Sequence, residues 1–221
     1  MVNLLLGIFK QRGYKVNEKP YQLNIVGLRS SATTAGNFDD HLVVFFKNNA
    51  GKWVEGAYKI TTDPGTYWLK HPMNVDGTAI LKEGQYVDAY KIGLHKGQYT
   101  ALVQAKPVTI LRDYDRNATL DFSSMSESTG MFGINIHRAG TTGATSTVDK
   151  WSAGCQVFEQ AKDFEQFIKL CEMHRKYYGN SFTYTLIDFR QARRKLWKQR
   201  ATIGLAALLA AGALTYYLLK N

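Results

Sequence analysis

The sequence predicts a mainly β domain, a sandwich or barrel-like sheet that packs one α-helix, followed by a C-terminal transmembrane α-helix. Many short stretches rich in β-branched and aromatic residues alternate with turn-forming segments. One stretch, 161–178, carries apolar residues at helical spacing, and another, 201–219, is long, apolar and uncharged. Hydrophobic residues make up 45% of the 221 residues, which is enough to bury a core and excludes a disordered chain.

The expected strands are short and bounded by turn residues. The segment SSATTAGNFD separates the first two, and NNAGKW leads into the third. Up to residue 86 the chain then alternates in short stretches, which Pro64–Gly65 and Asp76–Gly77 interrupt. From first to last, the expected strands cover 21–28, 40–46, 54–61, 99–104, 108–111, 132–136 and 182–187.

A single convincing helix is expected at Ala161–Tyr178. Its apolar residues Phe164, Phe167 and Cys171 recur at helical spacing and share one face. Gly179 follows at once and ends the helix. We therefore interpret Cys171 as a small core residue of this helix.

The C-terminal stretch 201–219, ATIGLAALLAAGALTYYLL, has the length and composition of a helix that crosses a bilayer. Trp197 before it and Tyr216 and Tyr217 near its end are expected as interfacial anchors. Small residues four positions apart would permit close packing of two such helices, and so a homo-oligomer. The alternative is a buried, Ala/Leu-rich soluble helix.

The net charge of +10 is concentrated in one place, because six arginines and lysines lie within 190–200. We expect this basic run to meet a lipid surface and expect no nucleic-acid partner. The positive-inside tendency then places the globular part on the cytoplasmic side. The apolar run 4–9 has no basic region or cleavage site and is expected to be no export signal, but a packing segment or membrane-touching arm.

These features divide the chain into four parts. They are an N-terminal arm at 1–20, a globular domain at 21–189, a basic juxtamembrane linker at 190–200 and a transmembrane helix at 201–219.

The strongest indication of chemistry is a histidine and a cysteine in small-residue turns. His137 lies in GINIHRAG, and Cys155 follows eighteen residues later in WSAGCQVF. An imidazole can take the proton of a thiol, and small neighbours such as Ser152 and Gly154 let a substrate carbonyl approach the sulfur. Backbone N–H groups near Gly154 and Cys155 would hold the developing oxyanion. The alternative is a core thiol near a surface histidine.

Other polar residues are weaker candidates. The loop AGTTGATST between the two residues suits a substrate-facing loop or an ordinary solvated one. Asp113 or Asp115 could bind a substrate amine, and a salt-bridged surface turn is the alternative. His95 could assist the site. No Cys/His cluster predicts a metal and no cofactor is expected, while a Cys155–Cys171 disulfide would block the proposed nucleophile.

The histidine followed by S-x-G-C resembles the L,D-transpeptidase family, whose catalytic domains act on bacterial peptidoglycan. The family pattern reads roughly HG(x)nSxGC[IV]R, and His137, Ser152, Gly154 and Cys155 match it. The resemblance implies that Cys155 is the nucleophile and His137 the base, in an L,D-transpeptidase-type β domain over about 21–187. GINIHR and SAGCQVF are similar to a divergent branch found in bacteriophage and bacteroidete sequences.

Two positions depart from the family pattern. Arg138 follows His137 where the family has glycine, and Val157 stands where the family has an arginine two residues after the cysteine. That arginine orients the substrate or the oxyanion loop in the family, so its loss concerns substrate choice more than thiol chemistry. Arg138 could supply a positive charge from the other side.

The resemblance implies acyl transfer through a thioester. His137 deprotonates Cys155 or holds it as a thiolate, and the sulfur attacks a carbonyl of a peptidoglycan stem peptide. Family members orient the histidine through a backbone carbonyl, so no acidic partner is needed. An amine acceptor gives a cross-link and water gives hydrolysis; the phage-like motif favours cleavage or remodelling.

The expected topology conflicts with a substrate outside the cell. A bacteriophage virion with an internal membrane, access to the wall at lysis, or a reversed topology would each resolve the conflict. Two other functions remain as alternatives. One is a structural membrane or virion protein that keeps the fold without the activity, and the other is a basic module that binds wall polymer or nucleic acid.

Overall fold

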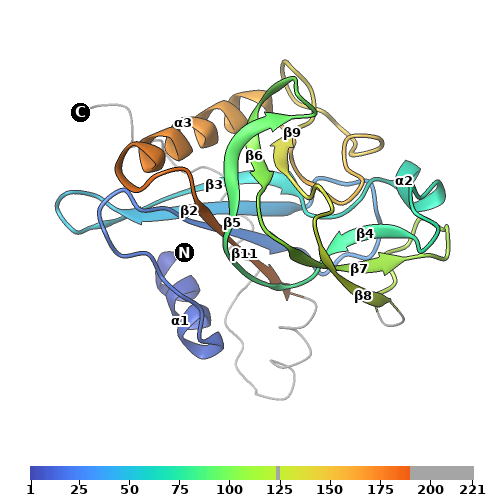
Figure 1. Cartoon of the computed structure of the whole chain (residues 1–221), viewed down its shortest axis with the longest axis horizontal. Coiled ribbons are helices and arrows are strands. Elements are labelled where there is room, and N and C mark those ends of the chain that lie inside the picture. Colours follow the sequence, from blue (N-terminus) through green and yellow to red (C-terminus); the bar gives the residue numbers. More distant parts are fainter. Residues whose placement is uncertain (123–124, 190–221) are drawn as a thin grey trace.

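The computed structural model describes residues 1–122 and 125–189. Figure 1 shows its helices and strands in chain order. They are α1 (Val2–Arg12), β1 (Asn24–Arg29), β2 (Asp40–Lys47), β3 (Trp53–Thr61), α2 (Thr66–Lys70), β4 (Thr78–Leu81), β5 (Gly84–His95), β6 (Tyr99–Gln104), β7 (Val108–Asp113), β8 (Ser126–Gly130), β9 (Ile136–Arg138), β10 (Gln156–Phe158), α3 (Ala161–Tyr178) and β11 (Phe182–Asp188).

Eight strands close into a barrel in the order β1-β11-β5-β6-β9-β10-β3-β2. Neighbouring strands are antiparallel except β1 with β11 and β9 with β10, which are parallel. Strands β4, β7 and β8 form a separate three-stranded sheet. The prediction of a mainly β domain with a packed helix is confirmed, and the sheet is a barrel.

Strands β1 and β2 are buried on both faces, because one face lines the barrel interior and α1 covers the other. In β1 and β2, Ile25 and Val44 point into the main core, to which α3 contributes Phe164 and Phe167. The alternate residues of the same strands, among them Val26 and Val43, pack against α1 on the opposite side. This explains why β1 is buried along its whole length, without the alternation of a half-exposed strand.

The N-terminal segment packs on the domain as a helix. Val2, Leu5 and Phe9 of α1 are buried against the outer face of β1 and β2, and Gly13 ends the helix in the left-handed conformation. The expectation of a packing segment is thus met, although the sequence did not predict its helical form.

One predicted strand is wrong and several elements were missed. Helix Ala161–Tyr178 was predicted with both its ends, whereas the strand expected at 132–136 begins only at Ile136. In place of strand-to-strand hydrogen bonds, the N–H groups of Phe132 and Ile134 donate to the side-chain Oε1 of Gln104, at 3.1 and 3.0 Å. Besides the helical form of α1, the elements that the sequence did not predict are α2, β8, β10 and most of β5.

The predicted juxtamembrane linker 190–200 and transmembrane helix 201–219 lie outside the described residues. Within residues 1–122 and 125–189, none of the helices combines the length and apolar character that a bilayer crossing requires.

Candidate active site

The structure brings His137 and Cys155 together on neighbouring parallel strands. His137 in β9 is the register partner of Val157 in β10. Cys155 directly precedes β10, where the N–H of Gln156 donates to the carbonyl of Asn135 at 2.9 Å and extends the ladder. Because residues two apart in a strand share a face, the side chains of Cys155 and His137 lie on the same face of this pair.

The thiol of Cys155 is held by two main-chain groups. Its Sγ accepts a hydrogen bond from the N–H of Asn135 and donates one to the carbonyl of Gly133, both at 3.4 Å. Burial raises the pKa of the Cys155 thiol to about 11, against the opposing effects of the Asn135 N–H and the charge of Lys96. The thiol is therefore protonated at neutral pH.

His137 is buried and held in one tautomer. Its Nδ1 lies 2.8 Å from the carbonyl oxygen of Arg138. A carbonyl can only accept, so Nδ1 carries the hydrogen and Nε2 keeps its lone pair. The hydroxyl of Tyr99 donates to the same carbonyl and lies 3.2 Å from Nδ1. Burial, reinforced by His95, lowers the pKa of His137 to about 3, so the ring is neutral at pH 7.

These protonation states bear on the two routes expected for the thiol. Within the described part of the chain, no hydrogen bond joins Cys155 to His137, and each is neutral at pH 7. These states do not favour a standing thiolate–imidazolium pair in the unliganded site. Contacts of this kind commonly tighten only when substrate binds.

His95 is a direct neighbour of the candidate base. Its ring stacks on that of His137 with centroids 4.0 Å apart and an interplanar angle of 23°. Its Nδ1 lies 3.1 Å from the amide nitrogen of Asn135, which can only donate. Asn135 therefore fixes His95 through its side chain and the Cys155 thiol through its backbone.

The side chain of Arg138 packs on the ring of Tyr99 and does not extend into solvent. Its guanidinium carbon is 4.2 Å from the centre of the Tyr99 ring, and Nη1 donates to the carbonyl of Gly140 at 2.6 Å. The side chain thus supports the tyrosine that contacts His137. Its predicted part in substrate binding stays a prediction.

The turn before Cys155 is shaped by the predicted residues Ser152 and Gly154. The Ser152 hydroxyl donates to the carbonyl of Cys155 at 2.8 Å and accepts from the N–H of Gly154 at 3.2 Å. Gly154 has a φ of +116°, and a Cβ there would lie 2.2 Å from the carbonyl oxygen of Ala79. Only glycine fits this position.

The expected oxyanion donor has to be corrected. The N–H of Gly154 is occupied by Ser152, so it is not free for a substrate. The N–H of Cys155 makes no hydrogen bond to any residue in the described ranges. Of the two N–H groups expected to hold an oxyanion, that of Cys155 is therefore the available one, and Ser152 and Gly154 shape the turn.

Asp113 and Asp115 lie elsewhere, at the end of β7 in the second sheet. Burial, and then the charge of Asp115, raise the pKa of Asp113 to about 6. Neither carboxylate contacts Cys155 or His137 among the described residues. Their predicted role toward a substrate amine is therefore not supported by the arrangement of the site.

Sequence reasoning missed Asn135, Tyr99 and Gly133, which complete the surroundings of the pair. Asn135 offered one signal, since it is a polar residue in the otherwise apolar run GINI before His137. Tyr99 reaches the site from a strand almost forty residues earlier in the chain, and no local pattern indicates that.

Comparison with known proteins finds no matching family model, no curated relative and no similar solved structure. The function is therefore inferred from the residues and the geometry of the site.

Replacing His137 with alanine should reduce substrate turnover by about 10²–10⁴-fold, because the proton acceptor for the thiol is lost. Since burial lowers the pKa of His137 far below its ordinary value of 6.5, the wild-type rate should hold as the pH falls through 6.5. The measurement is the pH profile of kcat/KM for both proteins. His71→Ala, at an exposed histidine of the α2 end, is the control. Equal losses in the two variants would remove His137 from the mechanism.

Proposed function

We propose that this chain is a membrane-anchored cysteine enzyme that acts on peptidoglycan stem peptides through a thioester on Cys155. The observation that carries the proposal is the histidine held by a backbone carbonyl. Its Nδ1 is bonded to Arg138, and its Nε2 makes no hydrogen bond to any residue of 1–122 and 125–189. This nitrogen belongs to the same strand face as the Cys155 thiol. This is the arrangement that the resemblance to L,D-transpeptidases implies.

The reaction has two steps, formation of the thioester and its breakdown, and His137 takes up and returns a proton in each. As Sγ of Cys155 attacks a peptide carbonyl, its proton passes to Nε2 of His137, and the N–H of Cys155 stabilises the oxyanion. The C–N bond then breaks, and His137 returns the proton to the leaving amine. Water or an amine attacks the thioester while His137 takes its proton. The C–S bond breaks and the thiol is restored.

Val157 occupies the position where the family has an arginine, and its surroundings could not hold a charged side chain. Val157 is fully buried and packs with Phe38, Ala139 and Val148. An arginine there would lose its hydration inside an apolar cluster. We therefore favour cleavage or remodelling of stem peptides, as in a virion-associated lytic enzyme, over efficient cross-linking.

A second function is favoured by one observation. The raised pKa of Cys155 describes a thiol without the activation that reactive cysteines commonly show. A structural membrane or virion protein that retains the fold without activity would have such a thiol.

Purified peptidoglycan separates the two functions. The full-length protein in detergent is incubated with it, and the released muropeptides are analysed by mass spectrometry. An enzyme gives new masses that correspond to a hydrolysed or exchanged stem-peptide bond. A structural protein leaves the muropeptide pattern unchanged.

The proposed anchor makes a separate prediction. The full-length chain should need detergent or sediment with vesicles, because 201–219 is apolar and uncharged. A chain ending at Phe189 should be soluble and keep the Cys155 chemistry, since the barrel closes within residues 24–188. Vesicle flotation in low and high salt is the measurement. Release by high salt would indicate charge-driven attachment through 190–200 in place of a spanning helix.

A further inference from the structure

A cavity of about 260 Å³ lies beside the turn that carries the candidate nucleophile. Ala153, two residues before Cys155, forms part of its wall, and so does Phe132. Phe132 directly precedes Gly133, whose carbonyl accepts the thiol hydrogen bond of Cys155. The cavity therefore borders both segments that hold the sulfur, the turn before Cys155 and the stretch before Gly133.

The cavity has apolar walls and one cationic group. Trp68, Met73 and Phe132 supply the apolar surface, while Arg112 supplies the charge. Arg112 in β7 is the register partner of Ala79 in β4, the residue whose carbonyl packs against Gly154. The second sheet thus brings a guanidinium next to the nucleophile turn.

Most N–H donors of the Arg112 guanidinium are available to a ligand. Nη1 donates to the carbonyl of Gly77 at 3.1 Å, and the guanidinium carbon lies 5.3 Å from the centre of the Phe132 ring. Within residues 1–122 and 125–189 it forms no ion pair, and its register partner on β8 is the uncharged Ser126. An arginine has five N–H donors, so an edge suited to a carboxylate remains open.

We propose that this cavity is a substrate subsite in which Arg112 binds a carboxylate of the peptide acylated on Cys155. The inference rests on the proposed function and adds the group that selects the substrate. Arg112, from the second sheet, would then supply the positive charge that the family has two residues after the cysteine, where this protein has Val157. The preferred substrate is a peptide with a free carboxylate within about one residue of the scissile carbonyl, next to an apolar group that fits against Phe132.

Two carboxylates of a stem peptide have this chemistry, the C-terminal one and that of the residue at the scissile bond. Binding is measured by calorimetry on the full-length Cys155→Ala protein in detergent, which cannot form the thioester. Three probes are compared: a stem tetrapeptide, its C-terminal amide, and the same peptide with only the side-chain carboxylate of its third residue amidated. The free acid should bind at least about tenfold more tightly than one of the two amides, as expected for one hydrogen-bonded charge pair.

Variants of Arg112 link this preference to the cavity. In the same Cys155→Ala protein, Arg112→Gln should bind the free acid and the amides equally, and Arg112→Lys should keep part of the preference because a point charge remains. Lys91→Gln, at an exposed position of β5, removes the same charge elsewhere and should change nothing. The comparison of free acid with amides in the protein that retains Arg112 does not depend on how well any Arg112 variant folds.

The outcomes separate this inference from the proposed function. Equal binding of all three probes, or a preference that persists in Arg112→Gln, overturns the subsite even if wild-type protein converts peptidoglycan. Carboxylate-dependent binding that is lost in Arg112→Gln supports the subsite even if wild-type protein converts nothing, in which case only the proposed reaction is wrong.

Discussion

Replacing Cys155 with alanine or serine should abolish muropeptide conversion, with a loss on the order of 10⁴-fold or more. Only the thiol can form the thioester, and a serine hydroxyl in the same place is far less acidic and less nucleophilic. The change should hardly alter thermal unfolding, because the hydrogen bonds of Sγ to the described residues are two long ones, to Asn135 and Gly133. The measurement is mass analysis of muropeptides, with a melting curve for each variant.

Cys171 is the matched control for this variant. It is fully buried in α3 among Phe164 and Phe167, and burial raises the pKa of its thiol well above the ordinary value. Cys171→Ala should cost about 1 kcal/mol through a lost apolar contact and leave the specific activity unchanged. If Cys171→Ala proves as inactive as Cys155→Ala while both remain folded, the assignment of the two thiols is wrong.

The parts of the fold that the sequence predicted are those with a local pattern. Helix Ala161–Tyr178 has apolar residues at a period of 3.6 and a glycine after its last turn, so both ends could be placed. The strand SESTG of β8 has no such pattern, because its residues are mostly exposed. It forms only by pairing with β7, and that partner lies outside any local window.

The same distinction applies to the site. The motif residues His137 and Cys155 could be found because both lie in one stretch of chain. The residues that surround His137 arrive from other strands: Tyr99 from β6 and His95 from β5. The thiol pKa could not be predicted either, since it depends on burial, which a small-residue turn does not reveal.

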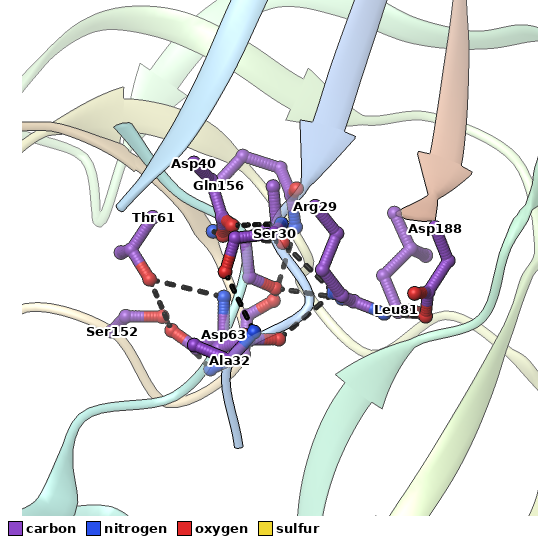
Figure 2. Close-up of polar contacts among 12 residues, drawn as sticks. Arg29, Ser30, Ala32, Asp40, Thr61, Asp63, Leu81, Ser152, Gln156 and Asp188 are labelled. Carbon is purple, nitrogen blue, oxygen red and sulfur yellow. Dashed lines mark hydrogen bonds and ion pairs between the residues drawn. The ribbon is translucent and has the colours of Figure 1, made fainter. Parts of the chain in front are cut away.

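Replacing Arg29 with methionine should lower the free energy of unfolding by about 3–5 kcal/mol, the effect of leaving buried charges without a partner. Arg29 has no exposed surface. Figure 2 shows Arg29 near the carboxylates of Asp63 and Asp188. Its Nε lies 2.9 Å from Oδ1 of Asp63, and its Nη1 lies 3.8 Å from Oδ2 of Asp188. Burial lowers the pKa of Arg29, but the charges of Asp63, Asp188 and Asp40 outweigh it and raise the pKa overall.

The same cluster supports the nucleophile turn, so the variant should also lose activity. Arg29 donates to the carbonyl of Thr62 at 2.9 Å, which fixes the chain just before Gly65. The N–H of Gly65 in turn donates to the carbonyl of Ser152 at 2.8 Å. Lys59→Met is the control for charge loss at the surface. Its half-exposed pair with Glu159 should contribute at most about 1 kcal/mol.

The destabilisation by Arg29→Met should depend on pH. Burial, and then the charges of Asp63 and Asp39, raise the pKa of Asp40 to about 7, above its ordinary value of 3.8. Folding therefore binds a proton at Asp40, and this stabilisation is complete below about pH 4 and lost as the pH rises to about 7. The charge of Arg29 opposes this shift, so removing Arg29 raises the pKa of Asp40 further. The protein then loses more folding stability at neutral pH, where Asp40 has to ionise.

Urea unfolding of both proteins at pH 5 and pH 7.5 measures this effect. The lowered pKa of His137 acts in the opposite direction, giving a stabilisation that is complete above pH 6.5 and lost in acid. It is common to both proteins and cancels in their difference. The difference in unfolding free energy should therefore be smaller at pH 5, where protonated carboxyls no longer need the guanidinium. An equal difference at the two pH values would mean that lost packing, and not uncompensated charge, destabilises the variant.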